Sequence, residues 1–245
     1  MLIINNKYIL TALTIVFFNI LSTRSSFGLE SFEARYKIYK GPITVGSIER
    51  SFELDKEGHY VFRSKMQSSG FVKFLSGTKL EETSRGKLLG NRIISESYLR
   101  ETDQKEKNYT LSFDEKNTVV RRTDLKSGYE EKMLSNIYDK LNYQAQMMLD
   151  IENLSQGLVY KVATQNKIVE YTITFVGKKE ISSPIGKFKT VIVNRKDPNS
   201  SKQTTVYCAS KLDWLPVKIK HIDKKGKSMT AILNSLVTKN RREKN

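Results

Sequence analysis

The residues able to support catalysis are few in this 245-residue chain, and they lie far apart in the sequence. Cys208 is the only cysteine, and His59 and His221 are the only histidines. A cysteine nucleophile needs a base close by, and nothing in the sequence pairs either histidine with Cys208. Cys208 lies in an apolar, strand-like run, which favours an inert buried thiol. Each histidine likewise favours an ordinary place on a strand rather than a catalytic one.

No sequence motif indicates a particular reaction. The chain has no Gly-rich phosphate loop, no G-x-S-x-G and no H-E-x-x-H, each of which would indicate a known catalytic arrangement. One cysteine excludes an intramolecular disulfide and is too few for a cysteine-based zinc or iron–sulfur site. The sequence therefore predicts a protein that is not an enzyme and that binds no cofactor or metal.

The first 28 residues predict export. Lys7 is followed by a mostly apolar run over residues 8–21, and Ser26 and Gly28 stand at the −3 and −1 positions of a cleavage site. This pattern is typical of a secretory signal peptide, here cut near Gly28-Leu29. The alternative is an uncleaved anchor, but the apolar run spans only ~21 Å as a helix, against ~30 Å for the core of a bilayer.

The rest of the chain predicts a single β-rich domain over residues 29–238, followed by a basic, disordered tail at 239–245. No later stretch of ~20 apolar residues could span a membrane once the signal peptide is removed. Lys and Arg number 42 against 26 Asp and Glu, so the formal net charge is +16. Such a charge suits an anionic surface of the cell envelope, but scattered lysines with no specific partner also explain it. Nucleic acid is not expected, because export argues against it and no binding motif accompanies the charge.

Alternating apolar and polar residues indicate strands over most of the domain. In the first run, Phe32, Ala34 and Tyr36 share one face, and charged residues lie between them. Residues 109–113 and the run that resumes at Thr118 flank a polar turn, which predicts a hairpin. The pattern predicts a mainly β fold, a strongly curved antiparallel sheet of about ten strands.

The segment 135–151 departs from this alternation. Tyr138, Leu141, Ala145 and Met148 are spaced by three, four and three residues, which places them on one face of a helix. Asp139 would lie in the first turn, where the helix dipole favours an acidic side chain. Because a single helix among strands must bury its apolar face, we expect it to pack on the concave side of the sheet.

Several stretches resemble the bacterial domain-of-unknown-function family 3108 (DUF3108). They are residues 36–46, Tyr138-Asp139-Lys140-Leu141, residues 171–186, and the closing strands at 191–195 and 215–219. The resemblance spans about residues 32–237 and departs from the family pattern at Ser183, where a threonine is expected. It implies a protein of the periplasm of a Gram-negative bacterium with no established biochemical role. By analogy of fold, it also implies a half-barrel similar to that of the lipoprotein carriers LolA and LolB.

Two functions are consistent with these observations. The first is a non-enzymatic envelope protein whose curved sheet and helix enclose an apolar cleft for a lipid or a lipid-bearing protein. The residues expected to line that cleft are Phe62, Tyr109, Leu111, Leu141, Met148, Tyr171, Ile173 and Phe175. The second is a structural or protein-interaction module of the envelope, in which the same residues form a filled core and no ligand binds. An open apolar cavity of ~300 Å³ or more would favour the first function.

Overall fold

The computed structural model describes residues 29–69, 79–123, 130–132, 136–196 and 200–238. The predicted signal peptide at 1–28 and the predicted tail at 239–245 lie outside these residues, so both stay predictions. The strands are β1 (Phe32–Lys40), β2 (Ile43–Leu54), β3 (His59–Ser68), β4 (Lys79–Leu89), β5 (Arg92–Thr102), β6 (Tyr109–Phe113), β7 (Val119–Arg122), β8 (Glu130–Lys132), β9 (Ile137–Tyr138), β10 (Leu158–Ala163), β11 (Ile168–Ser183), β12 (Gly186–Lys196), β13 (Gln203–Ala209), β14 (Leu215–Ile222) and β15 (Ser228–Thr238).

The helices of the described residues are short. The α-helix α3 spans Asn142–Asp150, and three 3₁₀ segments span Lys105–Lys107, Ile151–Gln156 and Ser210–Leu212. None of these helices is long and apolar enough to cross a membrane.

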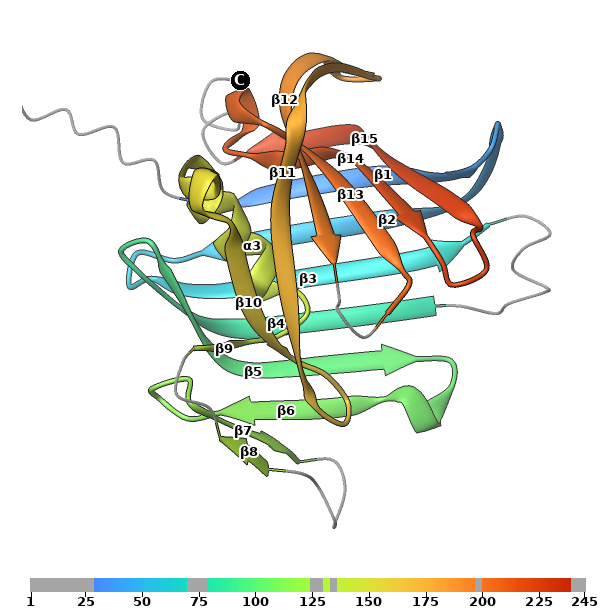
Figure 1. Cartoon of the computed structure of the whole chain (residues 1–245). Coiled ribbons are helices and arrows are strands. Elements are labelled where there is room, and N and C mark those ends of the chain that lie inside the picture. The colour runs from blue at the N-terminus through green and yellow to red at the C-terminus, as the bar shows by residue number, and fades with distance from the viewer. Residues whose placement is uncertain (1–28, 70–78, 124–129, 133–135, 197–199, 239–245) are drawn as a thin grey trace, which may run out of the picture.

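All the strands belong to one sheet, in the order β8-β7-β6-β5-β4-β3-β2-β1-β15-β14-β13-β12-β11-β10-β9. Neighbouring strands are antiparallel except β9 and β10, which run parallel. Figure 1 shows the sheet curving around α3, with β10 and β11 crossing in front of β3 to β5. The prediction of a mainly β, curved sheet with one helix is confirmed for the described residues. The expected number of about ten strands is wrong, in part because β8 and β9 have only three and two residues, too few to show alternation.

The two ends of the sheet approach each other through side chains. Arg122 of β7 donates from Nη1 to the carbonyl of Gln165 at 3.4 Å and to Oδ1 of Asn166 at 3.3 Å. Glu131 of β8 accepts a hydrogen bond from the backbone N–H of Ile168 at 2.9 Å. Since Gln165 and Asn166 form the turn between β10 and β11, these contacts give the open sheet a barrel-like shape.

Aromatic residues that alternate along the first strands fill the core. Phe32, Phe52, Tyr60 and Phe62 have ring centroids 5.5 to 6.1 Å apart, in stacked and edge-to-face pairs. Each such pair contributes about 0.5–1.5 kcal/mol beyond the apolar area it buries. Ala34 and Tyr36 of β1 are also buried, which confirms the predicted alternation.

The predicted hairpin is also confirmed. β6 and β7 pair as antiparallel strands, and Asp114 closes the turn by accepting the backbone N–H groups of Thr118 at 2.6 Å and Val119 at 2.7 Å. Asn117 has a φ of 54°, in the left-handed region that asparagine tolerates better than most residues.

The predicted helix over 135–151 begins later than its pattern indicates. Ile137 and Tyr138 form β9, and the α-helix starts only at Asn142. The cause is Asp139, whose carboxylate takes the backbone N–H groups of Leu141 and Asn142 and so ends the extended segment. Leu141, Ala145 and Met148 are buried as expected.

Gln146 is one of several buried residues of α3 that lie outside the predicted helix face. Its side chain is buried, and its Oε1 accepts the backbone N–H of Ile93 on β5 at 2.7 Å. The helix is therefore buried on more sides than the spacing of its apolar residues predicts.

Candidate functional site

Asp139 lies at the centre of a buried polar network. It is fully buried, and its Oδ1 accepts the backbone N–H groups of Leu141 at 2.7 Å and Asn142 at 2.8 Å. Its Oδ2 accepts the hydroxyl of Ser84, from β4, at 2.6 Å. In return, Oδ1 of Asn142 accepts the backbone N–H of Asp139 at 2.8 Å. The start of α3 is thus fixed to the sheet by one carboxylate.

The side chain of Asn142 extends this network to two further strands. Its Nδ2 donates to the hydroxyl of Tyr60, on β3, at 2.9 Å and to Oγ of Ser95, on β5, at 2.6 Å. Tyr60 Oη lies 3.2 Å from Ser84 Oγ. Because the single hydroxyl hydrogen of Ser84 points to Asp139, Tyr60 is the donor in that contact.

Ser95 connects the network to the β6–β7 turn. Its backbone N–H and C=O both bond to the side-chain amide of Asn117, at 2.5 and 2.7 Å, and its hydroxyl donates to the carbonyl of Ile137 at 3.2 Å. The backbone carbonyl of Asn117 in turn accepts the N–H of Ile137 at 2.8 Å. Three separate parts of the chain, namely β5, the β6–β7 turn and β9, therefore meet at this point.

Burial is the largest cause of the pKa shifts of Asp139 and Tyr60 in this network. It raises the pKa of Asp139 to about 7, against the opposing hydrogen bonds from Ser84, Asn142 and Leu141. Burial also raises the pKa of Tyr60, and the nearby Asp139 carboxylate raises it further. Ser84 and Asp139 are both enclosed, and their hydrogen bond joins the start of α3 to β4. The arrangement acts as an anchor for the helix.

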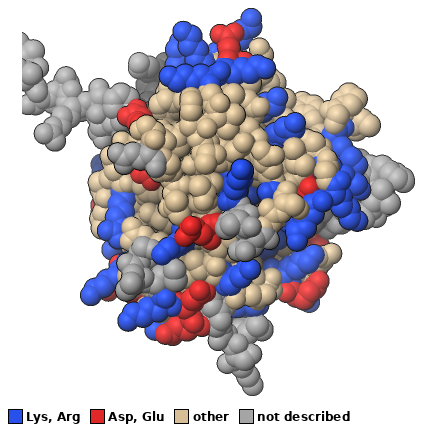
Figure 2. All heavy atoms as spheres, in the orientation of Figure 1, with Lys and Arg blue, Asp and Glu red and all other residues tan. Residues whose placement is uncertain are grey.

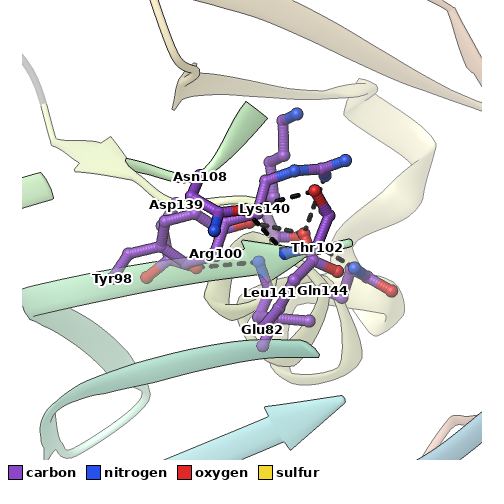
Figure 3. Close-up of polar contacts among 9 residues, drawn as sticks. All are labelled: Glu82, Tyr98, Arg100, Thr102, Asn108, Asp139, Lys140, Leu141 and Gln144. Carbon is purple, nitrogen blue, oxygen red and sulfur yellow. Dashed lines mark hydrogen bonds and ion pairs between the residues drawn. The ribbon is translucent and has the colours of Figure 1, made fainter. Parts of the chain in front are cut away.

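A second set of polar side chains lies beside this anchor (Figure 3). Glu82 of β4 accepts the hydroxyl of Tyr98 and lies 3.6 Å from Nη1 of Arg100, both on β5. Lys140 directly follows Asp139, and its Nζ is 5.9 Å from the centre of the Tyr109 ring. Burial lowers the pKa of Lys140, and the neighbouring Arg100 lowers it further.

Most of the side chains predicted to line a cleft lie together in the hydrophobic core. Six of them are at most 5% exposed and belong to one packed cluster: Phe62, Tyr109, Leu111, Leu141, Met148 and Ile173. Tyr171 is half-buried at its edge, with its ring 5.4 Å from that of Tyr143. Phe175 lies apart from the others and is 52% exposed, at a point where the register with β12 shifts. Their role in binding a ligand stays a prediction.

Three surface pockets lie near the far end of α3 and the β11–β12 hairpin. Those of about 150 and 230 Å³ share Leu29, Met148 and Asp213 among their lining residues. The third, of about 490 Å³, is lined by Lys178, Lys179, Glu180, Lys189, Thr190, Val191, Ser210 and Trp214. Met148 is the only predicted cleft residue that lines any of these three pockets.

The single cysteine and the two histidines lie in separate surroundings. Cys208 is fully buried, which raises the pKa of its thiol to about 12 and confirms the expected inert thiol. His59 is exposed and lies 3.2 Å from Asp55, whereas His221 is 3.0 Å from the hydroxyl of Thr204. Among the described residues, no group of three or more His, Cys, Asp or Glu side chains could hold a metal ion.

Sequence reasoning identified Asp139 but not its partners. Ser84, Ser95 and Asn117 lie in polar positions of strands and turns, and nothing in their local sequence separates them from exposed residues. Asn142 lies within the segment 135–151, where the apolar spacing selects other positions for the buried helix face. The one local signal is the acidic residue directly before a helical pattern, which is typical of a capping residue.

A family model for DUF3108, described as a protein of unknown function, matches residues 32–233. The chain belongs to the DUF3108 family. The sequence-based resemblance is thereby confirmed over nearly the whole described domain. No curated protein matches the chain.

Solved structures similar to this DUF3108 chain include one that supports its barrel-like fold. A β-barrel-like protein of the DUF1849 family from Brucella abortus is 11% identical with a TM-score of 0.59, and the match covers 86% of this chain and 98% of that one. A Bacteroides fragilis protein with a YmcC-like fold is 10% identical with a TM-score of 0.38, covering 86% and 97% of the two chains. The Pseudomonas aeruginosa MucA/MucB complex gives 11% identity and a TM-score of 0.36, and the match covers 88% of this chain but only 54% of that one.

Asp139 should make the stability of this DUF3108 chain depend on pH. Its pKa is about 7 in the folded state against 3.8 as its ordinary value, so the folded state holds the extra proton between about pH 4 and 7. The free energy of unfolding should therefore fall as the pH rises through this window, by up to about 1.4 kcal/mol per pH unit. Urea denaturation at several pH values, compared with Asp139→Asn, isolates this contribution. Parallel pH profiles for the two proteins would contradict it.

Proposed function

We propose that the chain is an exported, non-enzymatic protein of the bacterial envelope that works as an interaction module built on a filled barrel-like core. The observation that carries the proposal is the packing of six predicted cleft residues, each at most 5% exposed, into one hydrophobic cluster. Side chains that contact one another this closely leave little apolar surface for a ligand. Binding is therefore assigned to the outer surface.

The outer surface of β10 and β11 is the part best suited to a partner. Val159 of β10 is 55% exposed, and Val176 of β11 is 52% exposed. Figure 2 views the molecule from the side on which these strands lie in front, and it shows a broad uncharged area with Lys and Arg gathered around it. An uncharged centre with a charged rim is the usual composition of a protein–protein interface.

Export rests on the predicted signal peptide at residues 1–28, which lies outside the described residues.

The test uses the full chain, expressed in its own host and purified from the envelope, with a photo-crosslinking amino acid in place of Val159. Intact mass after irradiation should correspond to a chain beginning near Leu29, carrying one adduct of discrete mass. Native mass spectrometry before irradiation should show no bound lipid, because the core is filled.

The matched control places the crosslinker at Leu89, which is 58% exposed at the end of β4 and should give no discrete adduct. Equal adducts from both positions, or none from either, would contradict the assigned surface. A lipid carried through purification would instead support the apolar-ligand hypothesis, and a chain that begins at Met1 would contradict export.

A further inference from the structure

A pocket of about 490 Å³ lies between the β11–β12 hairpin and the turn that follows β13. The hairpin contributes Lys178, Glu180 and Lys189 to its lining, and the turn contributes Ser210 and Trp214. The volume is within the range of about 300–1,000 Å³ that is typical of small-molecule sites. Figure 2 shows Lys and Arg gathered at the top of the view, where Figure 1 places this hairpin.

The register of the hairpin places charged side chains on one face. Glu180 of β11 is directly opposite Lys189 of β12, and Lys178 is opposite Val191. Residues two apart on a strand share a face, and directly opposite residues are neighbours on it. Lys178, Glu180 and Lys189 therefore lie side by side. Thr190, at the alternate position of β12, is buried, so the charged face points away from the core.

The charges of this face are not engaged in ion pairs. Within the part of the chain that the structure describes, neither Lys178 nor Lys189 has a carboxylate within 4.0 Å, and Glu180 has no cation within that distance. Lys179 also lines the pocket, so three lysines accompany one glutamate. The pocket is therefore positively charged and retains one carboxylate that can accept hydrogen bonds.

The turn carries the only tryptophan of the chain in a strained backbone conformation. Asp213 and Trp214 have φ values of 49° and 61°, in the left-handed region that bulky residues rarely adopt. The backbone N–H of Trp214 donates to the carbonyl of Ala209 at 3.0 Å, and its indole Nε1 donates to Glu152 at 3.3 Å. These bonds hold the ring at the pocket, and strain of this kind is concentrated at ligand sites.

The three kinds of group in the pocket favour one class of ligand. Lysine ammonium groups attract an anion, but the carboxylate of Glu180 repels a bare oxyanion. An ionised carboxylate only accepts hydrogen bonds, so Glu180 suits a ligand with hydroxyl donors. The indole of Trp214 offers apolar surface to a ring. A ring that carries both hydroxyl groups and an anionic substituent satisfies all three.

We propose that this pocket binds an acidic sugar, meaning a saccharide ring with a carboxylate or phosphate substituent. Lys178 and Lys189 hold the anionic group, and Glu180 accepts hydrogen bonds from the sugar hydroxyls. The ring lies against Trp214. The pocket is lined by residues other than those of the outer surface proposed above, so this inference goes beyond the proposed function and does not depend on it.

The test titrates the full chain with glucuronic acid and glucose 6-phosphate, and with glucose and inorganic phosphate as the separate parts of the ligand. Calorimetry measures Kd, and the fluorescence of Trp214, the only tryptophan, reports binding at this turn. Both acidic sugars should bind about tenfold or more tightly than glucose or phosphate, because neither part alone uses every group. A short oligomer of glucuronic acid distinguishes a polysaccharide source, which it should match more tightly, from a free sugar.

Three variants assign the binding to the pocket. Lys189→Met should weaken both acidic sugars by about tenfold, since it removes one charge-assisted contact. Lys224→Met, at an exposed lysine of the β14–β15 turn, is the matched control and should bind as the wild type does. Glu180→Gln should narrow the preference for an acidic sugar over inorganic phosphate, because it removes the charge that repels a bare anion.

Melting curves without ligand establish that the variants fold, which is expected because all three positions are exposed. Equal Kd values for Lys189→Met and Lys224→Met would overturn the site. So would glucose or phosphate binding as tightly as the acidic sugars, or no saturable binding of either acidic sugar by the wild type.

Discussion

Replacing Asp139 by alanine is expected to lower the free energy of unfolding by about 3 kcal/mol or more, because the change leaves buried donors without an acceptor. The donors are the hydroxyl of Ser84 and the backbone N–H groups of Leu141 and Asn142. An acidic residue in an exposed first turn would cost less than ~1 kcal/mol when replaced by alanine. The structure places Asp139 in the core, so the larger value applies. Urea denaturation at pH 6 measures the loss.

Asp139→Asn is the matched control for this change. Asparagine keeps an oxygen for the two backbone N–H groups, and its amide can donate to Ser84, which then donates elsewhere. We expect it to cost about 1 kcal/mol, typical of one altered hydrogen bond. Losses below 1 kcal/mol for both variants would show that the network does not anchor the helix.

Leu141→Asp is expected to have a comparable effect for a different reason. Leu141 is 1% exposed within the hydrophobic cluster. A carboxylate at this position would be buried without a partner, which should cost about 3 kcal/mol or more. Thermal and urea unfolding, followed by circular dichroism, would measure the loss.

The control is Leu89→Asp, the same substitution at a leucine that is 58% exposed at the end of β4. An exposed substitution of this kind typically changes stability by less than about 0.5 kcal/mol. Similar losses for the two variants would mean that Leu141 does not face the core.

Asp139 also shows where local sequence rules fail. The acidic residue before an apolar pattern correctly predicts a helix start nearby. The same rule assumes a solvent-exposed helix end, whereas here the residue is enclosed by β4 and by the segment before the helix. Burial of a helix end depends on which strands pass beside it, and no property of the residues 135–151 records that.

The basic residues illustrate a second limit. Lys140 and Arg195 are scattered among many other basic residues of a +16 chain, and their types alone do not distinguish them. They differ from exposed lysines because the curvature of the sheet brings the β12 side towards α3, where Arg195 contacts Tyr143. Sequence composition is consistent with either an anionic partner or scattered lysines with no partner, and only the fold separates interior from exterior charges.

Features that depend on residues two to five positions apart follow from the sequence alone. Alternation of apolar residues determined the β class and the buried face of β1, and the turn residues Asp114 and Asn117 determined the β6–β7 hairpin. Side chains alternate between the two faces of a strand with a period of two residues. This alternation can therefore be recognised in the sequence without knowing which strands lie beside it. The ordered short motifs were sufficient to identify the family.

The partners of buried polar groups were decided only by the tertiary structure. Asn142 bonds to Tyr60, 82 residues earlier, and Asp139 to Ser84, 55 residues earlier. A buried polar atom must find a partner wherever the fold supplies one, and that partner has no fixed spacing in sequence. The same holds for closure of the sheet, where side chains of β7 and β8 meet the β10–β11 turn, because such contacts arise only once the curved strands have brought distant segments together.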